Sequence, residues 1–440
     1  MDVIKLRHGL TIELGGEAEK KLLSRCSATV EPLQTFGIVP DDFVGMKPKM
    51  MVREGDEVKA GDVLFVNKQY PDVRFVSPVD GKVVEIVRGD RRKVLCVKIE
   101  GKVAQRGATT PVAADDAAST VALLAEKGLL GFITQMPYAI SANNQELPRD
   151  IFVSAFRDMP LSADVDFCLQ GEEENFVKGI ETLSKIAPLH VGLSYEKQGE
   201  GIAQKLSTLG SPLCTLHYID GKCPAGNVNV QINNIKPINK GDIVWTVEPE
   251  VVVFIGRLMS TGNIDMRKKI AICGSDVEEP HYEEVVVGQS IMSLLPDVGD
   301  DSRIVNGNVL TGRKVAASSA FVGAHAYELT VIPEGNKTSE LLGWIAPMML
   351  RNRKPADARI KGGRRHMIMS GEYDKVLPMD IFGEYLIKAI ISGDIDRMEQ
   401  LGIYEVAPED FALAEYVDSS KLELQKIVRE GLDMLRKENS

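Results

Sequence analysis

Cysteine and histidine are the residue types that would bind zinc or an iron–sulfur cluster, and their spacing here favours no such role. No Cys-x-x-Cys pair occurs, and no cysteine–histidine spacing suits zinc or an iron–sulfur cluster. The histidines form no ligand pair at helical spacing. We therefore expect no metal site, and we expect buried, inert thiols in a reducing compartment. The cysteines are Cys26, Cys96, Cys168, Cys214, Cys223 and Cys273, and the histidines are His8, His190, His217, His281, His325 and His366.

Phosphate-binding loops are also missing from the sequence. Neither G-x-G-x-x-G nor G-x-x-x-x-G-K-[ST] occurs, so no motif supports a dinucleotide site or a P-loop. Gly362-Gly363-Arg364-Arg365 can be a flexible loop or an anion site, with about equal support. The residues by themselves indicate a soluble multidomain protein with no visible redox centre.

Lys68 is the lysine that a carrier domain would modify. MVREGDEVKAGDVLF (51–65) and VSPVDGKVVEIVRGDRRKV (76–94) read like the two halves of a biotin or lipoyl carrier, and Lys68 lies in the hairpin between them. Its neighbours are Asn67 and Gln69, not the Met-Lys-Met or Asp-Lys-Ala of carriers. We interpret Lys68 as an ordinary solvated lysine, and the module as a barrel-sandwich domain used for docking. A modified lysine is the alternative.

The elements that would position any site form four successive patterns. Period-2 alternation and turn signals predict an all-β unit, and alternating helices and strands predict a layered α/β unit with IFVSAF, DFCL, HVGLSY and VVVFI as buried strands. A small β-grasp pattern and a helical tail follow. We predict an α+β multidomain fold: a barrel-sandwich (biotinyl/lipoyl-like) domain with an N-terminal segment over 1–103, a Rossmann-like α/β domain over 104–255, a β-grasp, SLBB-like domain over 256–340 and a helical domain over 341–440.

Composition limits the possible partners. The 440 residues are 44% hydrophobic and 26% charged, with a formal net charge of −11 spread along the chain. This balance argues against nucleic acid and against binding an anionic bilayer by charge. The start lacks a secretory signal, and the most apolar window, Leu341–Leu350, is half the length of a membrane span. We expect a protein that is not integral to a membrane.

The ensemble of segments resembles the A subunit of the sodium-translocating NADH:quinone oxidoreductase. The resemblance runs almost end to end through MKPKMMVREGDEVKAGDVLF, RFVSPVDGKVVEIVRGDRRKVL, DIFVSAFRDMPLSAD, VVVFIGRLMSTG, RIVNGNVLTGRK, VIPEGNKTSELLGW and GEYDKVLPMDIFGEYLIKAIISGDIDRMEQLG. It implies a peripheral protein at the cytoplasmic face of the bacterial inner membrane, docked chiefly on the membrane-embedded B subunit. It also implies that this chain carries no covalently bound cofactor and that NADH, flavins and iron–sulfur centres belong to partner subunits. An Rnf-type electron-transport protein and a soluble flavin-dependent NADH:quinone oxidoreductase are the alternatives.

The same resemblance implies contact with a quinone, ubiquinone or menaquinone. Two stretches match the proposed contact: GIVPDDFVG with Phe43, and FITQMPYAI with Phe132, Gln135, Met136 and Tyr138. Phe132 or Met136 would line an apolar slot and Tyr138 would donate a hydrogen bond to a carbonyl oxygen. Many relatives have Arg-x-Arg-Pro-Phe where this chain reads TQMPY, so no charged residue is expected to bind quinone here. The alternative is interdomain packing, the commonest role of buried aromatic residues.

Overall fold

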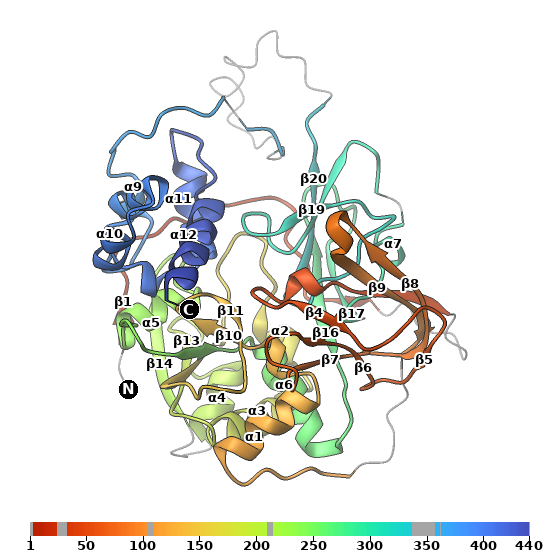
Figure 1. Ribbon diagram of the computed structural model, residues 1–440. Helices are drawn as coiled ribbons and strands as arrows, with labels where there is room; N and C mark the ends of the chain where they lie inside the picture. Colours follow the sequence, from red (N-terminus) through yellow and green to blue (C-terminus); the bar gives the residue numbers. More distant parts are fainter. Residues whose placement is uncertain are drawn as a thin grey trace.

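The computed structural model describes residues 3–23, 33–103, 110–208, 214–296, 298–336, 357–360 and 362–439. Figure 1 shows an orange β unit on one side, a green sheet flanked by helices, a teal sheet between them and blue helices at the C-terminal end. Cys26 and the apolar window Leu341–Leu350 lie outside the described residues. Among those described, each helix is too short or too polar to span a bilayer.

The first β unit is the barrel-sandwich domain, in which two small antiparallel sheets enclose a core. Period-2 alternation sends one face of each strand inward, where Phe65 and Phe75 stack with ring centroids 4.9 Å apart. The four-stranded sheet has the order β3 (Gln34–Ile38), β9 (Val94–Lys102), β8 (Asp80–Arg88), β5 (Glu57–Val58), and the three-stranded sheet has the order β4 (Pro48–Met50), β6 (Val63–Asn67), β7 (Arg74–Val76).

The α/β domain is built on a seven-stranded sheet that is parallel through its centre. Near one edge, β10 runs antiparallel to β15 and pairs with β11. The strand order is β1 (Val3–Lys5), β14 (Thr215–Asp220), β13 (Leu189–Ser194), β12 (Asp150–Ser154), β15 (Val244–Thr246), β10 (Thr134–Met136), β11 (Ile140–Ser141). Its helices are α1 (Ala117–Glu126), α2 (Val165–Leu169), α3 (Glu173–Leu183), α4 (Gly201–Thr208), α5 (Val228–Ile235) and α6 (Pro249–Thr261).

Two predicted strands of this domain are helices, so those two predictions were wrong. DFCL lies in α2, which Asp164 caps by accepting a hydrogen bond from the Phe167 amide. VVVFI lies in α6, which begins with Pro249 at its first turn and ends at Gly262 in the left-handed conformation. α6 crosses the predicted domain limit at residue 255, and the four predicted domain ranges stay predictions.

Packing explains why the β-branched run in α6 is helical. α6 packs against α3 so closely that a Cβ on Gly256 would lie 1.8 Å from the carbonyl oxygen of Asn175, and one on Gly179 would lie 2.1 Å from that of Val252. Glycines at the crossing let the two helices bury their shared face. This tertiary contact outweighs the strand preference of the valines.

The β-grasp-like domain contains a six-stranded mixed sheet and the short helix α7 (Ile291–Leu294). Its strand order is β19 (Arg313–Val315), β18 (Ser302–Asn306), β20 (Glu328–Pro333), β16 (Arg267–Cys273), β17 (His281–Val286), β2 (Leu22–Leu23). The last of these strands comes from the N-terminal segment, just as β1 joins the α/β sheet. The N-terminal segment therefore ties the α/β and β-grasp-like sheets together.

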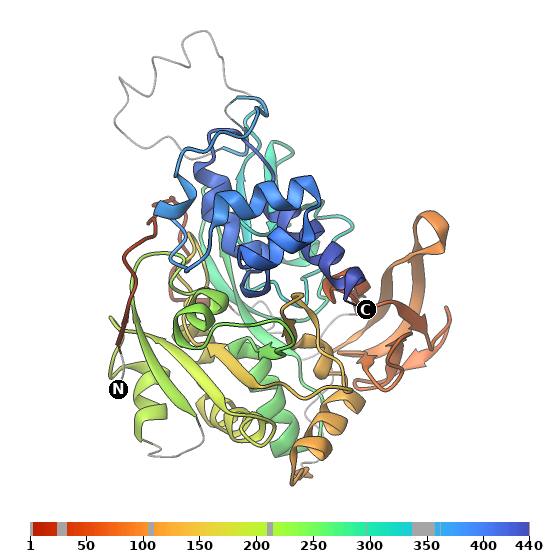
Figure 2. The same ribbon diagram turned by 60° about the vertical axis from the view of Figure 1, so that its left-hand side comes forward.

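The C-terminal helices pack against the α/β domain, as the blue ribbon in Figure 2 shows. They are α9 (Gly383–Ser392), α10 (Ile395–Gln400), α11 (Ala412–Val417) and α12 (Leu424–Glu438). Met136, Phe152 and Val244 of the sheet share one buried cluster with Leu386 and Val428 of these helices. A second cluster runs from the barrel-sandwich domain into the α/β domain, so neighbouring domains share buried apolar surface.

Candidate functional site

Phe43 and Phe132 meet where the barrel-sandwich, α/β and β-grasp-like domains come together. Phe43 follows a short 3₁₀ turn after β3, and Phe132 ends a 3₁₀ turn that leads into β10. Their ring centroids lie 5.2 Å apart at 83°, and Phe75 lies 4.5 Å from Phe43. His325 lies 6.2 Å from Phe43 and 6.0 Å from Phe132. We call these four residues the aromatic junction.

The cavity beside the aromatic junction is narrow. Phe43, Phe132, Asp42, Met266 and Ala324 line it, and its volume is about 10 Å³, room for about one water molecule. Its lining comes from all three domains, so a small separation of the domains would widen it. In this closed arrangement, a quinone ring does not fit without that separation.

His325 is the polar member of the aromatic junction. The Asp42 carboxylate accepts a hydrogen bond from the Ala324 amide (2.9 Å), and the Lys268 ammonium donates to the carbonyls of Gly323 (3.1 Å) and Ala324 (2.9 Å). Burial, with a smaller effect of the Lys268 charge, lowers the pKa of His325 to about 4. The imidazole is therefore neutral at pH 7.

Gln135, Met136 and Tyr138 do not join Phe43 and Phe132 in the cavity. The Gln135 carbonyl oxygen accepts hydrogen bonds from the indole of Trp245 (3.4 Å) and the side chain of Asn143 (3.3 Å). Met136 is buried in the cluster shared with the C-terminal helices, and Tyr138 packs at the margin of that cluster. The sequence neighbours thus separate because β10 and its following turn lead away from the aromatic junction toward the C-terminal helices.

A buried ion pair that sequence reasoning missed fixes the loop after β12. Arg157 donates to both oxygens of Glu250 (2.9 and 2.7 Å) and to Glu248 (2.9 Å) at the start of α6. Its guanidinium carbon lies 4.1 Å from the ring centroid of Tyr327 in the β-grasp-like domain. We call Arg157, Glu248, Glu250 and Tyr327 the charged joint. No local pattern could have found it, because 93 residues separate Arg157 from Glu250.

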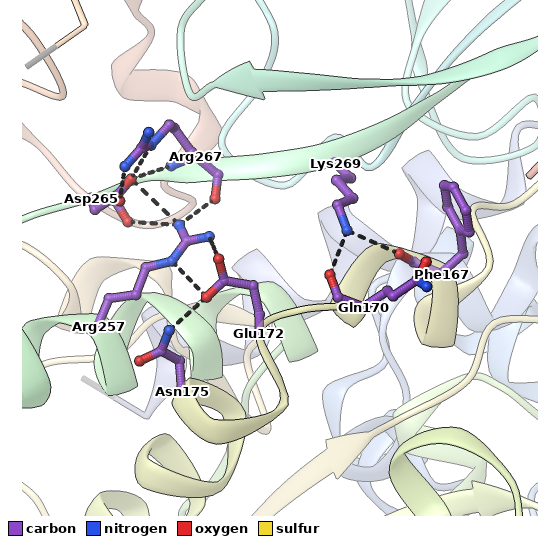
Figure 3. Close-up of polar contacts among 8 residues, drawn as sticks. All are labelled: Phe167, Gln170, Glu172, Asn175, Arg257, Asp265, Arg267 and Lys269. Carbon is purple, nitrogen blue, oxygen red and sulfur yellow. Dashed lines mark hydrogen bonds and ion pairs between the residues drawn. The ribbon is translucent and has the colours of Figure 1, made fainter. Parts of the chain in front are cut away.

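A second set of polar contacts, drawn in Figure 3, joins the α/β domain to β16. Arg257 of α6 donates to Glu172 (2.7 and 3.1 Å) and to the carbonyl of Arg267 (2.7 Å), while Asp265 pairs with both arginines. Lys269 donates to the carbonyl of Gln170 at 2.7 Å, near the end of α2 where carbonyls lack helical partners. These contacts hold β16 against α2 and α3.

These contacts border a charged cavity of about 150 Å³. That volume holds several water molecules. Its lining includes Arg257, Lys268 and Lys269 together with Glu172 and Glu250. Because the acids balance much of the basic charge and these cations already have protein partners, the cavity fits hydration of the interdomain contact better than an apolar ligand.

The thiols and imidazoles are dispersed through the interior. Among the residues described, no group of three or more histidine, cysteine or acidic side chains could hold a metal ion. Cys96, Cys168, Cys223 and Cys273 are buried, and burial raises the pKa of Cys96 and of Cys273 to about 12. These two thiols are therefore protonated and poor nucleophiles at pH 7.

Two histidines pair across strands, which helical spacing could not reveal. His190 Nδ1 lies 3.0 Å from His217 Nε2, and the His190 ring stacks on Phe152 with centroids 4.5 Å apart. Asp150 lies 3.5 Å from His190 Nε2. We assign this group to the packing of β12, β13 and β14.

Lys68 lies exposed just after β6, in the hairpin that leads to β7. Its amide donates to the carbonyl of Lys47 at 2.7 Å. That contact fixes the backbone and leaves the side chain in solvent, as for an unmodified surface lysine. The absence of a carrier arm stays a prediction.

Three domain families match this chain in order. The NqrA N-terminal barrel-sandwich hybrid domain matches residues 4–102, the NqrA second alpha/beta domain matches 115–264, and the NQRA C-terminal domain matches 269–317. Together they cover most of the chain. The chain belongs to the NqrA family. The expected barrel-sandwich, α/β and SLBB-like architecture is thereby confirmed.

Full-length relatives agree with the domain matches. One relative, from Neisseria meningitidis serogroup B, is named as the A subunit of Na(+)-translocating NADH-quinone reductase. It is 29% identical to this chain over 458 residues, and the match covers 99% of this chain and 100% of the relative. A protein of the same name from Haemophilus influenzae strain 86-028NP is 29% identical over 461 residues, with the same coverage of both chains. The similarity therefore includes the C-terminal region that the domain families leave uncovered.

Proposed function

We propose that this chain is the A subunit of a sodium-translocating NADH:quinone oxidoreductase, peripheral to the membrane and located at its cytoplasmic face. The observation that carries the proposal is the end-to-end match to relatives of that name. Other subunits of the complex, chiefly the membrane-embedded B subunit, are its partners. They supply the site for NADH, the flavins and the iron–sulfur centre, so this chain acts within the enzyme complex and is not catalytic alone.

The contribution of this chain is contact with the quinone, ubiquinone or menaquinone, at the aromatic junction. The support is physical: Phe43 and Phe132 offer two ring faces at 83°, and flat conjugated rings stack favourably on such surfaces. The cavity between the domains is narrow, about 10 Å³, so quinone entry requires a small separation of the barrel-sandwich domain from the α/β domain. Gln135, Met136 and Tyr138 would act indirectly, through the segment that carries Phe132.

Deleting the gene tests the place of this chain in the reaction. The remaining complex is purified, and flavin bleaching by NADH and reduction of ubiquinone-1 are measured separately. We expect quinone reduction to be lost while NADH still reduces the flavin. Loss of NADH oxidation with the other subunits still assembled would refute this placement. Stoichiometric flavin in the purified chain would favour the soluble flavoenzyme instead.

Conservative substitutions test the quinone contact itself. Phe43→Leu and Phe132→Leu keep an apolar side chain but remove the ring, whose stacking contributes about 0.5–1.5 kcal/mol. We expect each variant complex to show a KM for ubiquinone-1 raised roughly three- to ten-fold with flavin reduction by NADH unchanged. An unchanged KM in both variants would place the quinone elsewhere.

A further inference from the structure

We propose that His325 is the residue that hydrogen-bonds the quinone oxygen at the aromatic junction, an inference that rests on the proposed quinone contact. The imidazole lies 6.2 Å from the ring centroid of Phe43 and 6.0 Å from that of Phe132. These two phenylalanines belong to the barrel-sandwich and α/β domains, whereas His325 belongs to the β-grasp-like domain. A planar molecule held by the two phenylalanines would therefore present its edge to His325.

The backbone that carries His325 is fixed from both sides. Asp42 accepts a hydrogen bond from the Ala324 amide, and Lys268 donates to the carbonyls of Gly323 and Ala324. Lys268 is 4% exposed and lies with its ammonium 4.6 Å from the Tyr327 ring centroid. These contacts restrain the segment without using the imidazole, so the ring is positioned in advance for a ligand, which lowers the entropic cost of binding.

The half-buried imidazole of His325 makes ring contacts but no hydrogen bond to any side chain or backbone group in the described part of the chain. Because the residue is half-buried and neither nitrogen is a buried unpartnered atom, the nitrogens are accessible to solvent and therefore to a ligand. A neutral imidazole carries one N–H donor and one acceptor nitrogen, and His325 is neutral at pH 7 because burial lowers its pKa to about 4. The donor suits a quinone carbonyl, and the acceptor suits a quinol hydroxyl.

Other polar side chains near the aromatic junction are less suited to this role. The Lys268 ammonium donates to two carbonyls, and the Asp42 carboxylate holds the Ala324 amide. The Gln135 carbonyl oxygen accepts from Trp245 and Asn143. His325 therefore combines contact with both phenylalanines and an uncommitted donor, and it distinguishes a quinone from an apolar ring of the same shape.

The test compares His325→Leu, which removes both nitrogens, with His325→Gln, which keeps an N–H donor and an acceptor. Each variant is introduced into the intact complex, and the KM for ubiquinone-1 and the kcat are measured. One hydrogen bond to a carbonyl corresponds to roughly a three- to ten-fold change in affinity. We expect His325→Leu to raise KM by that factor and His325→Gln to retain most of the affinity. The matched control is His366→Leu at an exposed position, which should change nothing.

The outcomes separate this inference from the proposed function. A raised KM in the Phe43→Leu and Phe132→Leu complexes with an unchanged KM in His325→Leu would overturn the role of His325 and leave the quinone contact standing. An unchanged KM in all three would overturn both. If His325→Leu and His325→Gln raise KM equally while the melting temperature falls in both, His325 has a packing role and the inference is wrong.

Discussion

The charged joint makes a quantitative prediction, because it contains a buried carboxylate that depends on one guanidinium. The Glu250 side chain is 4% exposed and the Arg157 side chain 13%, whereas Glu248 is 42% exposed. Burial opposes the charge on Arg157, but the carboxylates of Glu250 and Glu248 raise the pKa of Arg157 well above its ordinary value. The pair is thus ionised, and Arg157→Met would leave Glu250 buried without the guanidinium that donates to both of its oxygens.

The expected cost follows from this difference in exposure. Removing one partner of a buried ion pair costs about 3–5 kcal/mol, and the lost stacking on Tyr327 is part of that sum. The contact with Glu248, which is half exposed, is worth about 1 kcal/mol or less. We therefore expect Arg157→Met to lower the free energy of unfolding by about 3–5 kcal/mol and Glu248→Gln by less than about 1 kcal/mol. The double variant Arg157→Met, Glu250→Met should recover most of the loss, because an apolar pair can replace buried ions.

Urea denaturation followed by the fluorescence of Trp245, which is buried in β15, measures these differences. The Trp344→Phe background removes the other tryptophan of the chain. Arg397→Met is the matched control, since the Arg397 side chain is 73% exposed beside Asp394 and should contribute below about 0.5 kcal/mol. The reasoning fails if Arg157→Met costs less than about 1 kcal/mol, or if the double variant is no more stable than Arg157→Met alone.

Three further predictions concern other parts of the chain. Burial raises the pKa of Asp158 from 3.8 to about 6, so the contribution of the protonated Asp158 carboxyl to folding stability is complete below pH 4 and is lost as pH rises through 6. Asp158→Asn should therefore be more stable than the parent by about 1–3 kcal/mol at pH 7.5 and equal to it below pH 4 in urea titrations. A less stable variant at pH 7.5 would contradict this prediction. Gly256→Ala places a Cβ 1.8 Å from the Asn175 carbonyl oxygen and should lower the free energy of unfolding by about 1–3 kcal/mol, measured by thermal melting. Gly15→Ala, whose added Cβ has nothing within 4 Å, is the neutral control. Equal melting temperatures of the two variants would show that α3 and α6 separate freely. Tyr138→Phe should leave the KM for ubiquinone-1 within about two-fold of the parent complex, since no hydrogen bond is lost, and a larger rise would restore the Tyr138 hydroxyl as the donor to the quinone.

Local chemistry predicted much of the architecture. Turn residues such as Gly55 and Gly61, both in the left-handed conformation, and period-2 alternation through Val97 and Ile99 indicated the barrel-sandwich strands. Leu95, which the same alternation would place on the inner face, is 39% exposed, and Cys96 is buried instead. These signals depend on adjacent residues alone, so they can be recognised without knowledge of the fold. The prediction of a strand for VVVFI was wrong because it used only the local strand preference of these residues. Their helical state depends on the glycine contacts with α3, which are distant in the sequence.

The candidate site divides in the same way. Phe43 and Phe132 came from the resemblance, and the structure places them in contact, whereas Gln135 and Tyr138, from the same stretch as Phe132, lie apart from the cavity. His325 could not be selected from the sequence, because its neighbours in the chain carry no pattern typical of a binding residue. Its proximity to both phenylalanines depends on the docking of three domains.

The sequence by itself determined the order of the domains and most strand and helix types, because these follow from the chemistry of neighbouring residues, and it indicated the family through the resemblance of whole segments. Only the tertiary structure decided that Arg157 meets Glu250 across 93 positions, that His190 meets His217 across 27, and that His325 faces Phe43. Such contacts form when the chain closes long loops to bury shared apolar surface. The spacing of neighbouring residues does not indicate which distant residues come into contact when those loops close.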